Sequence, residues 1–149
     1  MSYTSAKSRH SHQFDGLLQM KDAGLVAATG NATVSGSAKI LDAGSGLFEA
    51  DLIIDATAIE VGTGDEAYNI IVQGSNSPTF ASGIVNLAAR QLGHSSVTGE
   101  SASDAAGRYE LGIKNMDADG ATYRYLRVRT IVVGTIATGI NYSAFFSRA

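Results

Sequence analysis

The residues best suited to contact a partner are aromatic and basic side chains that alternate near the C-terminus. The segment YRYLRVR ends at Arg129, and in a strand every second side chain points to the same face. Arg127 and Arg129 then share a face with Tyr123 and Tyr125, and Arg124 lies on the other. Such residues can stack single-stranded bases, form a protein interface, or pair with acids of a neighbouring strand. The net charge of −3 weighs against nucleic acid.

Acidic side chains form a second candidate contact surface, on a strand predicted for residues 48–58. Its even-numbered positions, Ala58 included, are apolar, whereas Glu49, Asp51 and Asp55 fall on the opposite, wet face. Asp51 and Asp55 are about 13 Å apart at strand rise, too far for the paired carboxylates of a glycosidase. We expect the acids to pair with basic residues of the C-terminal third, the Arg strand among them, with contact to a basic partner as the alternative.

Two motifs could bind a metal ion, but each lacks a ligand. His10 and His12 would lie on one side of an extended segment with no third ligand near them, and His94 stands alone. Residues 115–120, NMDADG, resemble the start of a calcium loop, yet its twelfth position is Leu126 instead of glutamate. Asp and Gly at a hairpin tip explain the same string. Serine-hydrolase, zinc-protease and phosphate-loop motifs are absent, so we predict no enzymatic activity and no cofactor.

The elements that carry these residues are predicted to be strands. The chain of 149 residues has 17 glycines, one proline and no cysteine, which excludes disulfide scaffolds and cysteine-ligated zinc. Alternating segments separated by turns predict an all-β protein, an antiparallel β-sandwich or jelly roll of about eight strands. Residues 82–92 fit a short helix or a strand, and 93–107 a long loop. The predicted strands include 33–41, 48–58, 66–74, 108–114, 122–133 and 140–146. The strand 48–58 is the clearest, and a hairpin joins it to 66–74.

The first 13 residues differ in composition from the rest and carry no apolar period. We therefore predict a flexible N-terminal arm over 1–13 and a single β-sandwich domain over 14–149. Lys7 and Arg9 are the arm's candidates for contact with a partner. The chain contains no run of about 20 apolar residues and no apolar leader, so we expect synthesis in the cytoplasm and no membrane partner.

Several of these segments together resemble a known family, the small jelly-roll capsid cement (decoration) proteins of tailed bacteriophages. The likeness covers roughly residues 48–146. It rests on an Asp-rich strand before a Gly-acid turn, a strand like YNIIVQGS, a late R-x-R strand that enters a small-residue loop, and a C-terminal aromatic strand. The segments are 51–93, GRYELGIKN (107–115), YRYLRVRTIVVGT (123–135) and INYSAFF (140–146).

The resemblance implies a structural protein on the outer surface of a virion capsid. Such a protein binds the major capsid protein and copies of itself, as a dimer or trimer, and ties neighbouring subunits together against internal DNA pressure. It needs no cofactor, nucleic acid or membrane. Another small virion component (tail tube, head completion or fibre base), a carbohydrate-binding module or a jelly-roll hydrolase remain alternatives. The candidate partner contacts are then Lys7, Arg9, Glu49, Asp51, Asp55, Arg124, Arg127 and Arg129.

Overall fold

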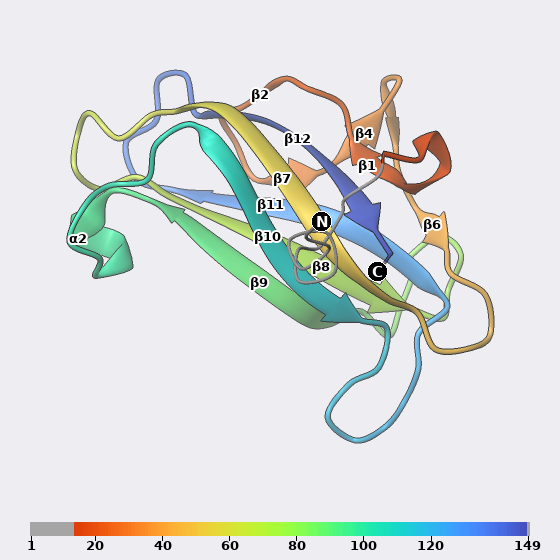
Figure 1. Cartoon of the computed structure of the whole chain (residues 1–149). Helices are drawn as coiled ribbons and strands as arrows, with labels where there is room; N and C mark the ends of the chain where they lie inside the picture. Colours follow the sequence, from red (N-terminus) through yellow and green to blue (C-terminus); the bar gives the residue numbers. More distant parts are fainter. Residues whose placement is uncertain (1–13, 149) are drawn as a thin grey trace, which may run out of the picture.

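The computed structural model describes residues 14–148, which form two antiparallel sheets packed face to face (Figure 1). In spatial order, sheet A contains β1 (Gln19–Lys21), β12 (Ile140–Ser147), β7 (Glu49–Ile59) and β10 (Gly107–Lys114), with β2 (Leu25–Val26) also paired to β12. Sheet B contains β3 (Gly30–Asn31), β11 (Tyr125–Val133), β8 (Ala67–Ser75) and β9 (Val85–Gly93), with β6 (Leu41–Asp42) also paired to β11.

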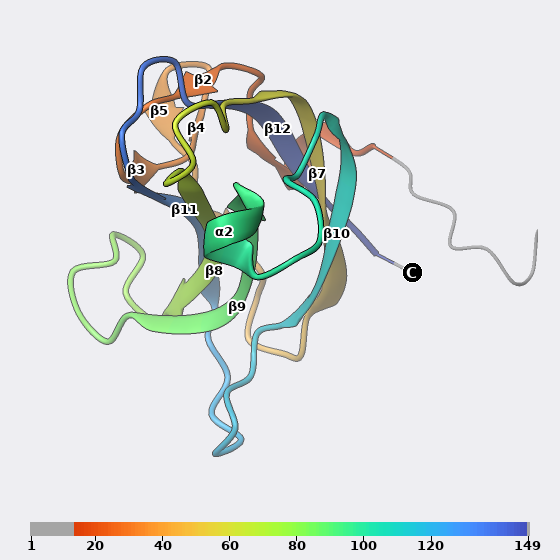
Figure 2. The ribbon, with the colours of Figure 1, turned by 90° about the vertical axis from the view of Figure 1, so that its left-hand side faces the viewer.

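Four short elements lie outside these sheets. β4 (Thr33–Val34) and β5 (Ser37–Ala38) form a hairpin of their own, the 3-10 helix η1 (Gly16–Leu18) precedes β1, and the helix α2 (Ser95–Thr98) follows β9. Figure 2 looks along the strands, with β12, β7 and β10 in one layer, β11, β8 and β9 in the other, and α2 at the near end. Among residues 14–148, no helix is long and apolar enough to cross a membrane.

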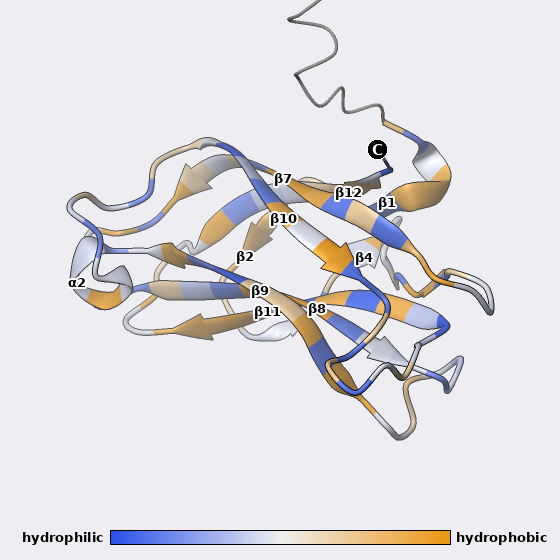
Figure 3. Cartoon of the chain, turned by 60° about the horizontal axis from the view of Figure 1, so that its bottom comes forward, coloured by the Kyte–Doolittle hydropathy of each residue, from blue (hydrophilic) through white to orange (hydrophobic). Residues whose placement is uncertain are grey.

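The core lies between the two sheets and confirms the predicted sandwich. The last strand, β12, presents the four side chains that its alternation indicates, and all four are buried. β7 contributes Leu52 and Ile54, and sheet B contributes Tyr68, Ile70 and Val128, each fully buried. Figure 3 shows the matching alternation of hydrophilic and hydrophobic residues along β7. The four residues of β12 are Ile140, Tyr142, Ala144 and Phe146.

The described residues form twelve strands instead of about eight, because the N-terminal part is divided into six short ones. The single strand predicted for 33–41 is a hairpin followed by β6. Ser35 and Gly36, with φ of 53° and 80°, make its tight turn. The ambiguous segment 82–92 is a strand, β9, and the predicted loop 93–107 includes α2.

The hairpin predicted between 48–58 and 66–74 is wrong, since β7 and β8 lie in different sheets. The connection crosses from one sheet to the other and is held by carboxylates that accept backbone N–H groups. Glu60 binds the amides of Ala137, Thr138 and Gly139, while Glu66 binds those of its own loop, Thr63 and Gly64 among them. A glycine-rich break thus marks a crossover between layers here.

These loop carboxylates predict a loss of stability in acid. Hydrogen bonds from the amides of Gly139 and Thr138 lower the pKa of Glu60, and the Thr135 amide lowers that of Asp65. Because the folded pKa lies below the unfolded one, the unfolded chain binds more protons as the pH falls. We expect the urea midpoint to be constant above about pH 5 and to fall as the pH drops through the lowered values. Urea titrations across this range test it. Glu60→Gln should flatten the dependence, and an unchanged slope in that variant would contradict the assignment.

A β-bulge corrects the face predicted for the end of β7. Asn141 pairs with Ala58, but the next residue of β12, Tyr142, pairs with Ala56, so Thr57 is an extra residue in β7. The bulge reverses the alternation. Ala58 is therefore exposed, and Ile59 packs against the core in its place.

Candidate docking faces

The two candidate contact surfaces lie on opposite outer faces of the sandwich. The acidic residues belong to β7 in sheet A, and Arg127 and Arg129 belong to β11 in sheet B. Leu126 and Val128, which alternate with these arginines, are fully buried in the core. The expectation that Glu49, Asp51 and Asp55 pair with the Arg strand is therefore wrong, because the core separates the two sets.

The broader expectation, that acids of the middle pair with bases of the C-terminal third, is confirmed by two other ion pairs. On sheet A, Arg108 donates two hydrogen bonds to the Asp55 carboxylate, from Nε at 2.7 Å and from Nη2 at 3.0 Å. Just before β11, Arg124 binds Asp42 of β6 in the same bidentate way, at 2.8 and 2.9 Å, and lowers the pKa of that carboxyl to about 2. Asp55 and Arg124 are thus neutralised within the chain.

Arg127 is held in place by an aromatic ring and an amide. Its guanidinium lies 4.4 Å from the centre of the Phe80 ring, and its Nε donates to the side-chain oxygen of Gln73 at 2.9 Å. Gln73 in turn donates to the side-chain oxygen of Asn86 on β9. Two linked side-chain amides therefore hold the guanidinium in position. Burial lowers the pKa of Arg127, and the charge of Arg129 lowers it further. The charge is therefore ordered and partly desolvated before any partner arrives.

Phe80 adopts a backbone conformation that is unusual for an aromatic residue. Its φ is +55°, and its side chain is 5% exposed. A bulky residue in the left-handed region costs of order 1–3 kcal/mol and persists only where its surroundings enforce it. The result of this strain is a ring placed under the Arg127 guanidinium.

Arg129 completes the outer face of sheet B. Its Nη1 donates to Asn31 on β3 at 2.9 Å. No carboxylate among residues 14–148 lies within ion-pair distance of either Arg127 or Arg129. We call Arg127 and Arg129, with the supporting Gln73, Phe80, Asn86 and Asn31, the arginine face. Tyr125 shares this face as predicted, whereas Tyr123 precedes β11 and donates its hydroxyl to Asp117.

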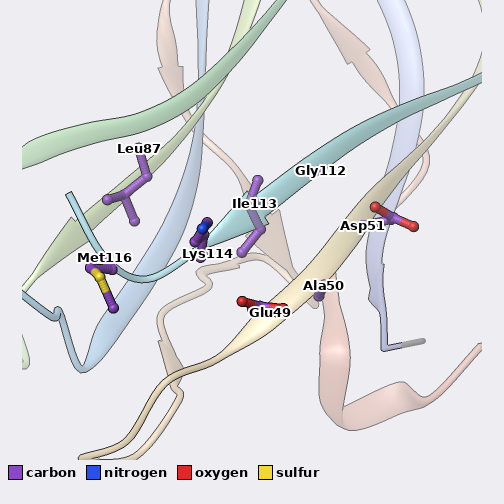
Figure 4. A pocket seen from close by; sticks show the side chains of 8 residues that line it. All are labelled: Glu49, Ala50, Asp51, Leu87, Gly112, Ile113, Lys114 and Met116. Carbon is purple, nitrogen blue, oxygen red and sulfur yellow. The ribbon is translucent and has the colours of Figure 1, made fainter. Parts of the chain in front are cut away.

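The acidic face of sheet A borders a pocket of about 620 Å³ between the β9 and β10 edges. Glu49 pairs in register with Lys114, and Asp51 pairs with Gly112, which leaves space beside its carboxylate. Figure 4 shows Leu87 and Met116 at one end of the pocket, with Glu49 and Asp51 along β7. None of the eight lining residues is aromatic, so the pocket has no platform on which a sugar ring could stack.

An apolar patch lies on the same outer face, where the described chain begins. Phe145 and Ile53 are buried although they point away from the core, and they sit opposite one another on β12 and β7. Phe14 covers Phe145 edge-on at 5.4 Å but is itself 62% exposed. The first described residue thus lies against sheet A, and the arm predicted for 1–13 lies outside the described residues.

In the calcium-like string, the side-chain oxygens of Asn115 and Asp117 accept hydrogen bonds from the chain itself. Asn115 is fully buried and binds backbone groups of neighbouring segments, and Asp117 accepts the amides of Asp119 and Ala121. The string is a hairpin tip. Between residues 14 and 148 no three His, Asp or Glu side chains gather in a geometry suited to a metal ion. His94 caps α2.

The predicted site residues are thereby divided into three groups. Lys7 and Arg9, like His10 and His12, lie outside the described residues. Asp55 and Arg124 are bound in ion pairs. Glu49, Asp51, Arg127 and Arg129 make no ion pair within residues 14–148.

Comparison with known proteins does not place the chain in a family. No family model matches it, and no curated protein matches it significantly.

Proposed function

We propose that this chain is a capsid cement protein, which binds the outer surface of a phage shell and links neighbouring major capsid protein subunits. The observation that carries the proposal is the placement, on opposite outer faces of one sandwich, of charges that make no ion pair among residues 14–148. Arg127 and Arg129 lie on one face, and Glu49 and Asp51 on the other. A cement protein must contact at least two neighbours at once, and weak contacts repeated over a shell gain strength by multivalency.

The charged residues that lack an ion pair within the described chain favour recognition of a partner over catalysis. Where the chain has carboxylates clustered, at Glu60, Asp65 and Glu66, they accept hydrogen bonds that hold a loop. The resemblance of residues 48–146 to cement proteins adds the shell as the surface that is recognised. The arm of 1–13 would supply a further contact beside the Phe14 patch.

Sedimentation of a native lysate tests the proposal. The chain should run with megadalton particles, in near-stoichiometric amount to a major shell protein when both are counted by mass spectrometry. A handful of copies per particle would indicate a tail, head-completion or fibre-base component instead. A chain found only as a free small oligomer would contradict the proposal.

Deleting residues 2–12 should weaken attachment to the shell without unfolding the sandwich. The core that residues 14–148 form between the sheets extends from Met20 to Phe146, so the urea midpoint should stay the same. Attachment is measured by co-sedimentation of purified protein with native particles stripped of this chain. The control is a variant with residues 2–12 in scrambled order, which keeps their length and charge. Attachment by the deletion variant as strong as by the full chain would rule out a role for the arm.

A further inference from the structure

We propose that the arginine face is the surface that docks on the shell, and that it takes two carboxylates spaced two residues apart on an extended segment of the shell protein. This inference rests on the proposed function and deepens it, since it names the face and the chemistry of the partner. The partner would lie along β11 and present one carboxylate to Arg127 and one to Arg129.

The geometry of the two arginines matches that spacing. Arg127 and Arg129 are two residues apart on one strand, so their side chains leave the sheet roughly 7 Å apart. Extended segments present alternate side chains at the same interval. A guanidinium binds a carboxylate best through two parallel N–H groups. Arg127 uses only Nε within the described chain, which leaves both terminal nitrogens available, and Arg129 uses only Nη1.

The arginine face is also prepared for binding before the partner arrives. Phe80 and Gln73 hold the Arg127 guanidinium, and Asn31 holds that of Arg129. Side chains that are already ordered lose less entropy on association, and ordered arginines at the centre of an interface are frequent sites of high binding energy. The supports are neutral amides and a ring, so the positive charge is left for a partner to neutralise. The strained backbone of Phe80 is accounted for by this role.

A second copy of this chain fits the arginine face less well. The acidic face of sheet A could offer carboxylates, but Glu49 stands directly across from Lys114 and Asp55 is bound to Arg108. Among residues 14–148 only Asp51 of these three acids has no cation opposite it in register or in an ion pair, so a second copy would offer one fully available carboxylate to two arginines. Nucleic acid fits poorly too, since its binding needs many phosphate contacts, and the neighbouring Arg124 is already paired with Asp42.

Matched arginine variants test the inference by co-sedimentation with native particles stripped of this chain. Arg127→Gln/Arg129→Gln removes both charges of the face. Arg90→Gln/Arg148→Gln removes the same charge from two arginines that stack on Tyr109 and Phe48. We expect the first pair to weaken binding at least tenfold and the second less than twofold, and wild-type binding to weaken as salt is raised. Arg127→Lys/Arg129→Lys keeps the charge but loses the two parallel N–H donors of each guanidinium, so its binding should be weaker than wild type and stronger than that of Arg127→Gln/Arg129→Gln. Equal urea midpoints establish that all variants are folded.

Each other outcome overturns the inference in a distinguishable way. Wild-type protein that fails to rebind stripped particles contradicts the proposed function, and the inference with it. Rebinding by Arg127→Gln/Arg129→Gln within twofold of wild type leaves the function standing and removes the arginine face as the docking surface. A free oligomer that this variant dissociates in sedimentation velocity would assign the face to contacts between copies. Binding of a single-stranded oligonucleotide that the variant abolishes would assign it to nucleic acid.

Discussion

Replacing Asn115 by alanine should lower the free energy of unfolding by about 3 kcal/mol or more, as estimated from three lost hydrogen bonds and the buried groups they leave unpaired. The Asn115 side chain is fully buried. Its Oδ1 accepts the amide of Phe48 at 2.7 Å, and its Nδ2 donates to the carbonyls of Gly46 and Tyr123 at 2.9 and 3.0 Å. It therefore joins the entry of β7, the exit of β10 and the approach to β11. Urea unfolding followed by circular dichroism measures the loss.

Asn141 provides the matched control. It is also an asparagine, but it is only partly buried, and its buried side-chain oxygen has no hydrogen-bond partner among residues 14–148. Asn141→Ala should change the free energy of unfolding by less than about 1 kcal/mol, because no hydrogen bond of that oxygen is lost. If both variants lost the same stability, the effect would belong to asparagine removal in general and not to the network around Asn115.

The strands with strict alternation could be predicted because every second residue is apolar where one face of a strand borders the core. In β10 the predicted inward residues, Tyr109, Leu111 and Ile113, do pack against the core. In β12 all four do. The faces of β11 follow the same rule, with Leu126 and Val128 inward and the arginines outward.

The pairing of strands could not be read from the same pattern. Period two says which side chains share a face, but it says nothing of which strand lies beside which. The acidic strand and the Arg strand have complementary charges, yet they lie in different layers. Asp55 pairs instead with Arg108 on the neighbouring β10, and Arg124 with Asp42 on β6. The bulge at Thr57 likewise depends on the partner strand.

The residues that hold Arg127 in place could not be predicted from the sequence either. Gln73 and Asn86 are polar residues on strands and carry no motif. Phe80 lies in a loop after the only proline, Pro78, and its positive φ has no signal in the sequence, since glycine is the residue that such a conformation favours. Only the folded chain brings these residues beneath Arg127.

Phe146→Ala should cost about 3–5 kcal/mol of the free energy of unfolding, the usual range for removing a buried aromatic ring. Phe146 is fully buried on β12, the strand that lies between β1 and β7 in sheet A, and its ring meets that of Phe48 edge-on at 5.6 Å. The substitution leaves a cavity between the sheets and removes this contact. Small domains are stable by only about 5–15 kcal/mol, so the variant should unfold at a much lower urea concentration.

Phe14→Ala is the control for this substitution, because it removes the same side chain from the outer surface of the same sheet. Phe14 contacts Phe145 edge-on, but it is 62% exposed. Its loss should cost under about 1 kcal/mol, since little apolar surface returns to water.

The two variants also separate stability from recognition. If Phe14 belongs to a docking patch, Phe14→Ala should weaken co-sedimentation with stripped particles while its urea midpoint stays near that of wild type. Phe146→Ala should lower the midpoint, yet the fraction that remains folded should bind as before. A Phe146→Ala loss below about 2 kcal/mol would mean that the sheets close over the gap, contrary to the usual behaviour of such cores.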